Sequence, residues 1–391
     1  MSGMGGIANA GERIAGKYDT VALVLQGGGA LGAYQAGVYE ALHEAGIAPD
    51  WIAGISIGAI NAALIAGNRP EDRVPRLRQF WEMVTKPSLP ILDANPFESL
   101  IGDGLAARHL LNHFSASEAV FKGVPGFFAP HFLPAPFQPN GAKAALAHYD
   151  TAPLRETLLD LVDFDRINAR TARFSVGAVN VRTGNFTYFD NATRKIGPEH
   201  VMASGALPPG FPPIEIDGES YWDGGLVSNT PLNYVIETEP RLLSLVFQVD
   251  LWSAAGAYPS DLGGVAERQK DISYSSRTRM STDTFAFVQE TRRQIRELLK
   301  KLPDELRAAP EAISLQAIAE RASMNIVHLI YRKKRHETYS KDFNFSRTAM
   351  KEHWTAGYQD TVRTLRHQDW LDPPTPEVGI LTHDVHQQGR D

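Results

Sequence analysis

The chain contains no cysteine among its 391 residues. This absence excludes disulfides, thiolate nucleophiles and cysteine-ligated zinc or iron–sulfur centres. Basic residues are in a slight minority, because 39 Lys and Arg stand against 45 Asp and Glu, for a formal net charge of -6. Since nucleic acids bind to basic surfaces, we expect no nucleic-acid partner.

Long apolar runs are missing as well. No stretch approaches the roughly 18 consecutive apolar residues that a membrane-spanning helix needs. The first twenty residues lack the basic segment followed by an apolar segment that is typical of a secretory signal. We therefore expect a cytoplasmic protein, and peripheral contact with a membrane stays open.

Glycine, in contrast, is abundant, with 33 residues. The first seventy residues alternate between expected strands (Val21–Leu25 and Trp51–Ile55) and expected helices (31–45 and Ile57–Ala66). This order predicts an α/β fold with a central, mostly parallel sheet. We expect a flexible arm over 1–19, a main domain over 20–260, a C-terminal α+β extension over 261–370 and a disordered tail over 371–391.

A glycine-rich loop follows the first expected strand and carries the pattern GxGxxG at Gly27, Gly29 and Gly32. A dinucleotide site would need an acidic residue at the end of the second strand, but Asp50 lies before that strand. A phosphate-binding Walker loop would need a Gly-Lys-Ser/Thr sequence, which does not follow. Two interpretations remain: a plain tight turn, or an oxyanion hole formed by several glycine N–H groups at the start of a helix.

The second motif is GxSxG, at Gly54, Ser56 and Gly58, between an expected strand and an expected helix. This is the setting of a nucleophile elbow, although a turn of small residues would look the same. A nucleophilic serine needs a base. Among the twelve histidines, His131 is a remote candidate, and His328 lies in an apolar strand where a buried structural role is expected.

An alternative base is Asp223, which ends an expected strand and is followed by Gly224 and Gly225. The two glycines would let the aspartate approach another backbone closely. A plain turn aspartate is the competing interpretation.

Taken in order, these motifs resemble those of the patatin-like phospholipase family, which carries GGGxxG, GxSxG and Asp-Gly-Ala/Gly. Residues 203–213 (ASGALPPGFPP) are similar to a fourth family segment, and the resemblance covers about residues 20–260. It implies a three-layer patatin-like fold, with Ser56 as nucleophile, Asp223 as its base and no cofactor or metal. It assigns Gly27, Gly28 and Gly29 to the oxyanion hole and Gly32, Gly54, Gly58, Gly224 and Gly225 to the motifs.

The implied function is a serine acyl hydrolase, of the lipase, phospholipase A or esterase type, that cleaves carboxylic esters of lipids through an acyl-enzyme. A catalytically silent lipid-binding or scaffold protein on the same fold is the alternative. Many family members have an arginine where this chain has Ala30 and Leu31, so an ester substrate is expected more firmly than a phospholipid. The Phe- and Pro-rich segment Phe121–Pro139 is expected to be a lid, a core-covering loop or a membrane contact. Self-association stays open.

Overall fold

The structure is a computed structural model, and it describes residues 10–85, 116–238, 242–275, 278–319, 323–334, 337, 339–367, 370–375 and 378–384. The α-helices are α1 (Ala10–Ile14), α2 (Ala33–Glu44), α3 (Ile57–Ala66), α4 (Pro70–Val84), α7 (Ala152–Leu161), α8 (Phe164–Asn168), α9 (Pro198–Ser204), α10 (Leu232–Glu237), α11 (Leu262–Tyr274), α12 (Thr278–Lys300), α13 (Asp304–Arg307), α14 (Pro310–Ala319) and α15 (Arg347–Arg366). The strands are β1 (Thr20–Leu25), β2 (Trp51–Gly54), β3 (Ala129–Pro130), β4 (Tyr149–Asp150), β5 (Arg173–Asn180), β6 (Phe186–Asp190), β7 (Ile214–Ile216), β8 (Glu219–Asp223), β9 (Ser244–Asp250), β10 (Met324–Ile330) and β11 (Ile380–His383).

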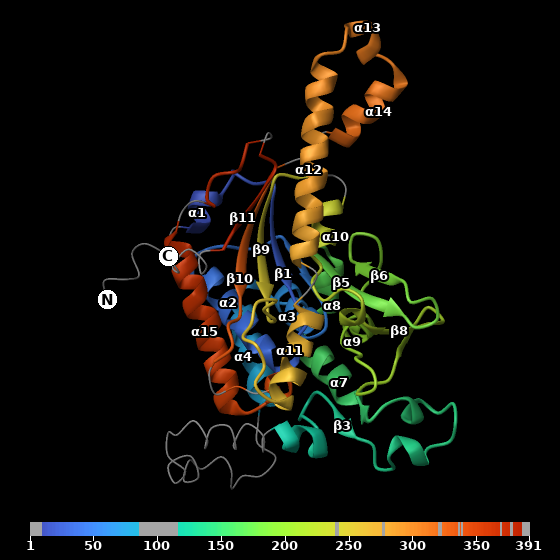
Figure 1. Cartoon of the computed structure of the whole chain (residues 1–391). Coiled ribbons are helices and arrows are strands. Elements are labelled where there is room, and N and C mark those ends of the chain that lie inside the picture. Colours follow the sequence, from blue (N-terminus) through green and yellow to red (C-terminus); the bar gives the residue numbers. More distant parts are fainter. Residues whose placement is uncertain are drawn as a thin grey trace.

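Within these ranges, nine strands form one sheet in the order β11-β10-β9-β1-β2-β5-β8-β7, with β6 paired to β5. The pairs from β11 to β5 are parallel. The strands β6, β7 and β8 add antiparallel pairs at the other side of the sheet. The predicted α/β fold with a central, mostly parallel sheet is therefore confirmed (Figure 1).

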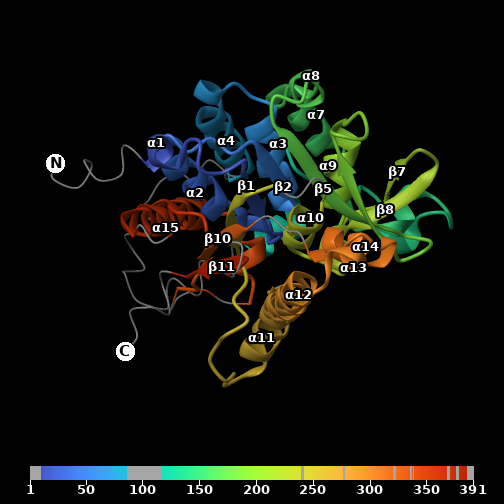
Figure 2. The same ribbon diagram turned by 90° about the horizontal axis from the view of Figure 1, so that it is seen from above.

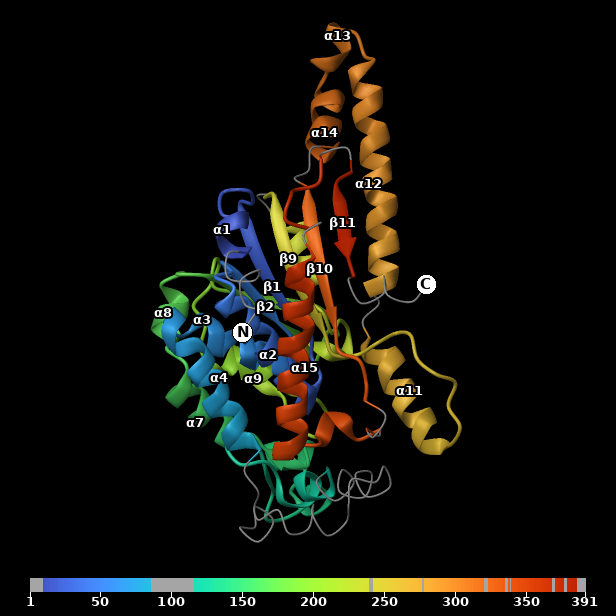
Figure 3. The same cartoon turned by 90° about the vertical axis from the view of Figure 1, so that its left-hand side faces the viewer.

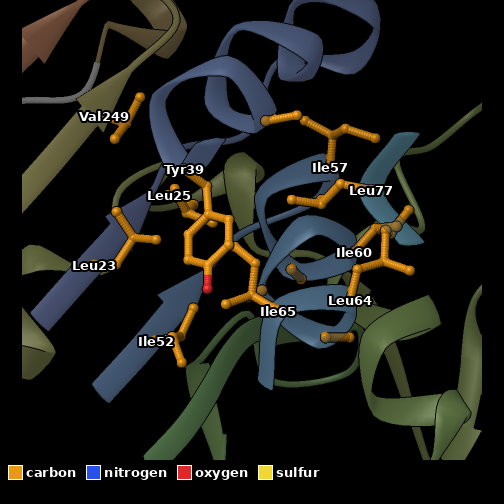
Figure 4. Close-up of a cluster of buried hydrophobic side chains, with 14 of the residues drawn as sticks. Leu23, Leu25, Tyr39, Ile52, Ile57, Ile60, Leu64, Ile65, Leu77 and Val249 are labelled. Atoms are coloured by element: carbon orange, nitrogen blue, oxygen red, sulfur yellow. The ribbon is translucent and has the colours of Figure 1, made fainter. Parts of the chain in front are cut away.

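Both faces of the sheet are covered, which gives three layers. On one face, apolar side chains of β1 and β2 pack against α2, α3 and α4, and Figure 4 shows Leu23, Leu25 and Ile52 next to Tyr39 and Ile65. On the other face, a smaller cluster joins the strands to α10 (Figure 2). Strands buried on both faces read as continuous apolar runs, and β1 and β9 have that pattern.

The chain beyond residue 260 continues this sheet. Strand β10 pairs with β9 along seven residues, from Met324 opposite Ser244 to Ile330 opposite Asp250. Helix α15 packs lengthwise on α2 (Figure 3). The two helices touch closely, because a side chain at Gly37 would collide with the Trp354 backbone and one at Gly357 would collide with the Tyr34 backbone. The C-terminal region and the preceding residues thus share one sheet.

Two terminal predictions differ from the structure. Residues 10–14, expected within a flexible arm, form α1 and bury Ala10 and Ile14 in the main core, whereas residues 1–9 lie outside the described ranges. Residues 380–383, expected within a disordered tail, form β11 and pair in parallel with β10. Both segments are ordered by partners far away in the sequence, which local composition does not reveal.

Helices α12, α13 and α14 form a hairpin that extends away from the body in both side views (Figures 1 and 3). The segment 116–150 lies at the opposite end of the molecule. It contains the two-stranded pairing of β3 with β4.

Candidate active site

Two of the sequence motifs meet at one edge of the sheet because β1 and β2 are parallel neighbours. Leu25, the last residue of β1, is paired with Gly54, the last residue of β2. The glycine loop follows the first strand and Ser56 follows the second, so both begin at the same carboxyl edge. Close packing requires the glycines of GxSxG, since a side chain at Gly58 would collide with the Leu25 carbonyl group. Ligand sites of open α/β sheets lie at this edge.

Ser56 occupies a strained turn between β2 and α3. Its φ is 55° and its ψ is -123°, a conformation that L-residues rarely adopt. The residue is partly exposed, whereas its neighbours Ile55 and Ile57 are buried. The fold therefore presents the serine at the surface of an otherwise buried junction, as the nucleophile-elbow prediction requires.

The fourth motif of the sequence supports this turn from the side. The Ser56 N–H donates to the Ser204 hydroxyl at 3.1 Å, and Ser204 is fully buried at the end of α9. Two residues later, the Ala206 carbonyl accepts a hydrogen bond from the Asp223 N–H at 3.0 Å. Residues 203–206 therefore contact the backbones of both predicted catalytic residues.

Asp223 ends β8 and lies beside Ser56. Its carboxyl group interacts with the side chain of Ser56, and its Oδ1 accepts the Gly225 N–H at 2.7 Å. Burial raises the pKa of Asp223 to about 7, against the lowering effect of these two interactions. Gly224 is needed because a side chain there would meet the Gly177 carbonyl oxygen on β5 at 2.6 Å. A buried carboxyl group whose pKa is near neutrality can exchange a proton with the serine hydroxyl.

The three glycines predicted for the oxyanion hole have different surroundings. The Gly27 N–H donates to the Asn229 carbonyl at 3.2 Å, so it is already engaged. Gly28 precedes the short 3-10 turn Gly29–Gly32, and Gly29 is its first residue. This turn continues directly into α2, and Gly29 has a φ of 57°. No hydrogen bond within the described ranges uses the N–H of Gly28 or Gly29. N–H groups without a partner at a helix start are chemically able to bind a negative oxygen.

Several residues that sequence reasoning missed fix the shape of the glycine loop. Gln26 is fully buried, and its side chain donates to Thr230 Oγ1 and accepts from the backbone of Leu251 and Trp252. The Gly27 carbonyl accepts from Trp252 Nε1 at 2.8 Å and from Asn229 Nδ2 at 3.0 Å. Asn229 belongs to the Asn-Thr-Pro sequence that follows Asp-Gly-Gly. That short sequence is the signal from which a role for Asn229 could have been predicted.

The C-terminal region also reaches the glycine loop. The carbonyl group of Tyr274, at the end of α11, accepts from Gln26 Nε2 and Asn229 Nδ2, each at 3.0 Å. The tyrosine ring lies 5.3 Å from the Trp252 ring, and the charge of Asp223 contributes to raising the pKa of Tyr274 after the larger effect of burial. Residues beyond 260 therefore contact the residues that shape the glycine loop.

An ion-pair cluster joins α11 to the 3-10 turn Lys341–Phe343, and we call it the α11 clamp. Lys341 Nζ lies 2.7 Å from Asp271 and 3.3 Å from Glu267, and its side chain is 4% exposed. Lys270 pairs with Asp342 at 2.9 Å. The Asp342 carbonyl oxygen fills the space where a side chain of Gly29 would be. The α11 clamp therefore fixes the position of groups that contact the loop.

The structure also locates His328, His131 and the Phe-rich segment. His328 contacts Asp250 at 2.7 Å within the sheet, so its expected structural role is confirmed. His131 follows β3 in the 116–150 segment, and its backbone N–H donates to the His148 carbonyl group. Phe127 and Phe128 are buried, which fits the core-covering interpretation for that part of Phe121–Pro139.

Across the described ranges, no group of three or more His, Asp or Glu side chains is arranged to hold a metal ion. None of the helices in those ranges combines the length and the apolar character needed to cross a membrane.

Comparison with known proteins finds the same family that the order of the motifs suggests. A family model described as patatin-like phospholipase matches residues 23–236, and another described as patatin phospholipase matches residues 272–377. Human patatin-like phospholipase domain-containing protein 6 is 43% identical over 76 residues, which are 19% of this chain and 6% of that protein. Lysophospholipase nte1 of Aspergillus terreus is 55% identical over 64 residues, 16% of this chain and 4% of that protein.

These relatives are much longer than the region of similarity, which is about a twentieth of their length. Among solved structures, VipD from Legionella pneumophila aligns with 89% of this chain and 67% of its own, at 15% identity and a TM-score of 0.36. The first family model alone spans more than half of the sequence and contains both Ser56 and Asp223. The chain belongs to the patatin-like phospholipase family.

Proposed function

We propose that this protein is a serine acyl hydrolase that cleaves carboxylic esters of lipids with Ser56 as nucleophile and Asp223 as general base. One observation carries the proposal: a serine in a strained, partly exposed turn lies beside a buried aspartate whose pKa burial raises to about 7. Family membership and the names of the relatives, a lysophospholipase among them, support a lipid ester as the substrate class.

In the first step, ionised Asp223 takes the proton of the Ser56 hydroxyl as its Oγ attacks the ester carbonyl carbon. The carbonyl oxygen becomes negative, and the N–H groups of Gly28 and Gly29 stabilise it. The tetrahedral intermediate collapses, the carbon–oxygen bond of the ester breaks, and the leaving alcohol receives the proton from Asp223. An acyl group is then bound to Ser56.

In the second step, Asp223 takes a proton from a water molecule, and the resulting oxygen nucleophile attacks the acyl carbon. The same two N–H groups stabilise the second oxyanion. Collapse of this intermediate returns the proton to Ser56 and releases a carboxylic acid. A single carboxylate suffices as base because its desolvation brings its pKa close to the pH at which it works.

The alternative is a catalytically silent lipid-binding protein on the same fold. The placement of Ser56 beside Asp223 favours the hydrolase, because a scaffold has no need of a strained serine beside a buried acid. A cytoplasmic location and peripheral contact with a membrane belong to the same proposal.

The test is hydrolysis of a chromogenic short-chain ester and of a lysophospholipid by the wild-type protein, Ser56→Ala and Asp223→Asn. Both variants should lose at least about a thousand-fold in kcat/KM. Ser314→Ala, an exposed serine on α14, is the matched control and should keep full activity. An organophosphonate should label the wild type and Ser314→Ala but not Ser56→Ala. Retained hydrolysis in Ser56→Ala would refute the assignment, and a wild type that neither hydrolyses nor is labelled would favour the silent alternative.

A further inference from the structure

The segment between residues 116 and 150 exposes large apolar side chains to solvent. Phe132 is fully exposed, Phe121 is 79% exposed and Phe137 is 71% exposed. Partly exposed apolar residues lie around them in the sequence, namely Val120, Leu133 and Leu146. We call these six residues the 120–146 apolar surface. Isolated apolar residues on a protein surface are ordinary, but several within one short segment point to a binding surface.

The exposed phenylalanines do not hold the segment in place, because other aromatic residues do. Phe127 and Phe128 are buried, and the Phe128 ring lies 4.8 Å from Tyr149 and 5.1 Å from Phe211. The Phe127 ring lies 6.0 Å from Phe345 of the C-terminal region. The segment is thus anchored by one set of rings while another set is presented outward.

The anchored base of the segment connects directly to the candidate active site. The backbone N–H groups of His148 and Tyr149 donate to the carbonyl groups of Pro209 and Gly210, each at 3.0 Å. That loop follows Ser204, whose hydroxyl accepts the Ser56 N–H. Hydrogen bonds at residues 209–210 and at Ser204 therefore link the base of the segment to the turn that holds Ser56.

The segment carries very little charge. Between residues 116 and 150, the acidic and basic residues are Glu118, Lys122, Lys143 and Asp150, and the first two pair with each other at 3.2 Å. A basic run elsewhere in the chain begins at Arg332, but Lys333 pairs with Glu267 and Lys334 with Glu352. A charged partner would find few complementary groups here, whereas insertion into an uncharged apolar phase costs little desolvation.

We propose that the 120–146 apolar surface binds the surface of a lipid bilayer and holds the active site against its substrate. The proposal rests on the proposed function, because a lipid ester that is insoluble in water must be reached in the membrane. Phe121, Phe132 and Phe137 enter the interfacial region, and Phe127 and Phe128 keep the segment attached to the enzyme. The contact is driven by apolar burial and not by charge.

The experiment is sedimentation of the full chain with neutral phosphatidylcholine vesicles, with and without added phosphatidylserine. The test variant is Phe132→Ser combined with Phe137→Ser, two substitutions at exposed positions. The matched control is Phe287→Ser on α12, where the ring is 72% exposed, on a helix outside the 116–150 segment. The wild type, Phe287→Ser and Ser56→Ala should bind the vesicles equally, and the double variant about a hundred-fold more weakly.

Two readouts separate this proposal from the function on which it rests. Hydrolysis of a water-soluble short-chain ester should differ by less than about two-fold between the double variant and the wild type, whereas Ser56→Ala should lose hydrolysis and keep binding. Binding of the wild type to neutral vesicles should be the same in low and high salt. Equal binding by the double variant would overturn the proposal, and so would binding that requires phosphatidylserine. Sedimentation velocity showing that the same two substitutions convert a dimer to a monomer would assign the surface to a second copy of the chain instead.

Discussion

At the scale of single residues, the active-site proposal depends on a serine and an aspartate that the sequence motifs identified and on contacts that they could not. Ser56 and Asp223 were predicted from GxSxG and Asp-Gly-Gly, each with a competing interpretation as a plain turn. The engagement of the Gly27 N–H by Asn229 and the bond from the Ser56 N–H to Ser204 became visible in three dimensions. Such pairs join residues about 150 to 200 positions apart, and one sequence contains no record of that proximity.

The raised pKa of Asp223 predicts how activity depends on pH. A carboxyl group accepts a proton from serine only when it is ionised, and burial raises its pKa to about 7. The kcat/KM for a short-chain ester should therefore rise about ten-fold for each pH unit below 7 and level off above it. The measurement is a rate profile from pH 5 to 9, with circular dichroism at each pH to show that the fold is intact. A flat profile between pH 5 and 7 would argue against Asp223 as the base.

At the scale of elements, the outlines of most helices and strands followed from hydrophobic patterns and glycine positions. The expected strands Val21–Leu25 and Trp51–Ile55 correspond to β1 and β2, and the expected helices over 31–45 and Ile57–Ala66 correspond to α2 and α3. The division of the chain at residue 260 stays a prediction, although β10 and β11 extend the same sheet. Strand order is decided by partners distant in sequence, so local patterns give the strands without giving their neighbours.

From the α11 clamp we predict that Lys341, a buried cation of the C-terminal region, affects both stability and activity. Lys341→Met would remove the positive charge that pairs with the mostly buried carboxylates of Asp271 and Glu267. This loss should lower the unfolding free energy by about 3 kcal/mol. The kcat should also fall, because Asp342 and Tyr274 contact the glycine loop and its partners. Urea unfolding and steady-state kinetics measure the two effects.

The matched control for this clamp is Lys300→Met on α12. Lys300 pairs with Glu297 at 2.9 Å, but both side chains are more than half exposed. Exposed ion pairs contribute little, so this variant should unfold and turn over as the wild type does. Equal losses of unfolding free energy and of kcat in Lys341→Met and Lys300→Met would show that the α11 clamp has no particular connection to the site.

At the scale of the whole molecule, the region beyond residue 260 is part of the structure that supports the site. Strand β9 lies between β1 and β10, and α15 covers α2. Helix α2 in turn begins at the glycine loop. The sequence suggested an extension without a role, because family motifs ended near residue 260 and the helical patterns that followed carried no chemistry.

A chain that ends at residue 260 should therefore fail to fold. It would lack the β10 partner of β9 and the helix that covers α2, so apolar surface and an unpaired strand edge would meet water. Expression should give insoluble protein, or a soluble form without a cooperative thermal transition. A chain that ends at Thr375 keeps α15 and β10 and loses β11, so it should fold with a lower Tm. A stable, active protein of 260 residues would show that the sheet does not depend on its last strands.

The place of β10 in the sheet has a consequence for how the protein is made. A ribosome completes Ser56 and Asp223 long before it reaches Met324, where the strand beside β9 begins. The nascent chain therefore holds both reactive groups while the scaffold around them is unfinished. Hydrolytic competence would appear late in synthesis, when the final strands and α15 have docked, and products of premature termination would carry the motifs without the activity.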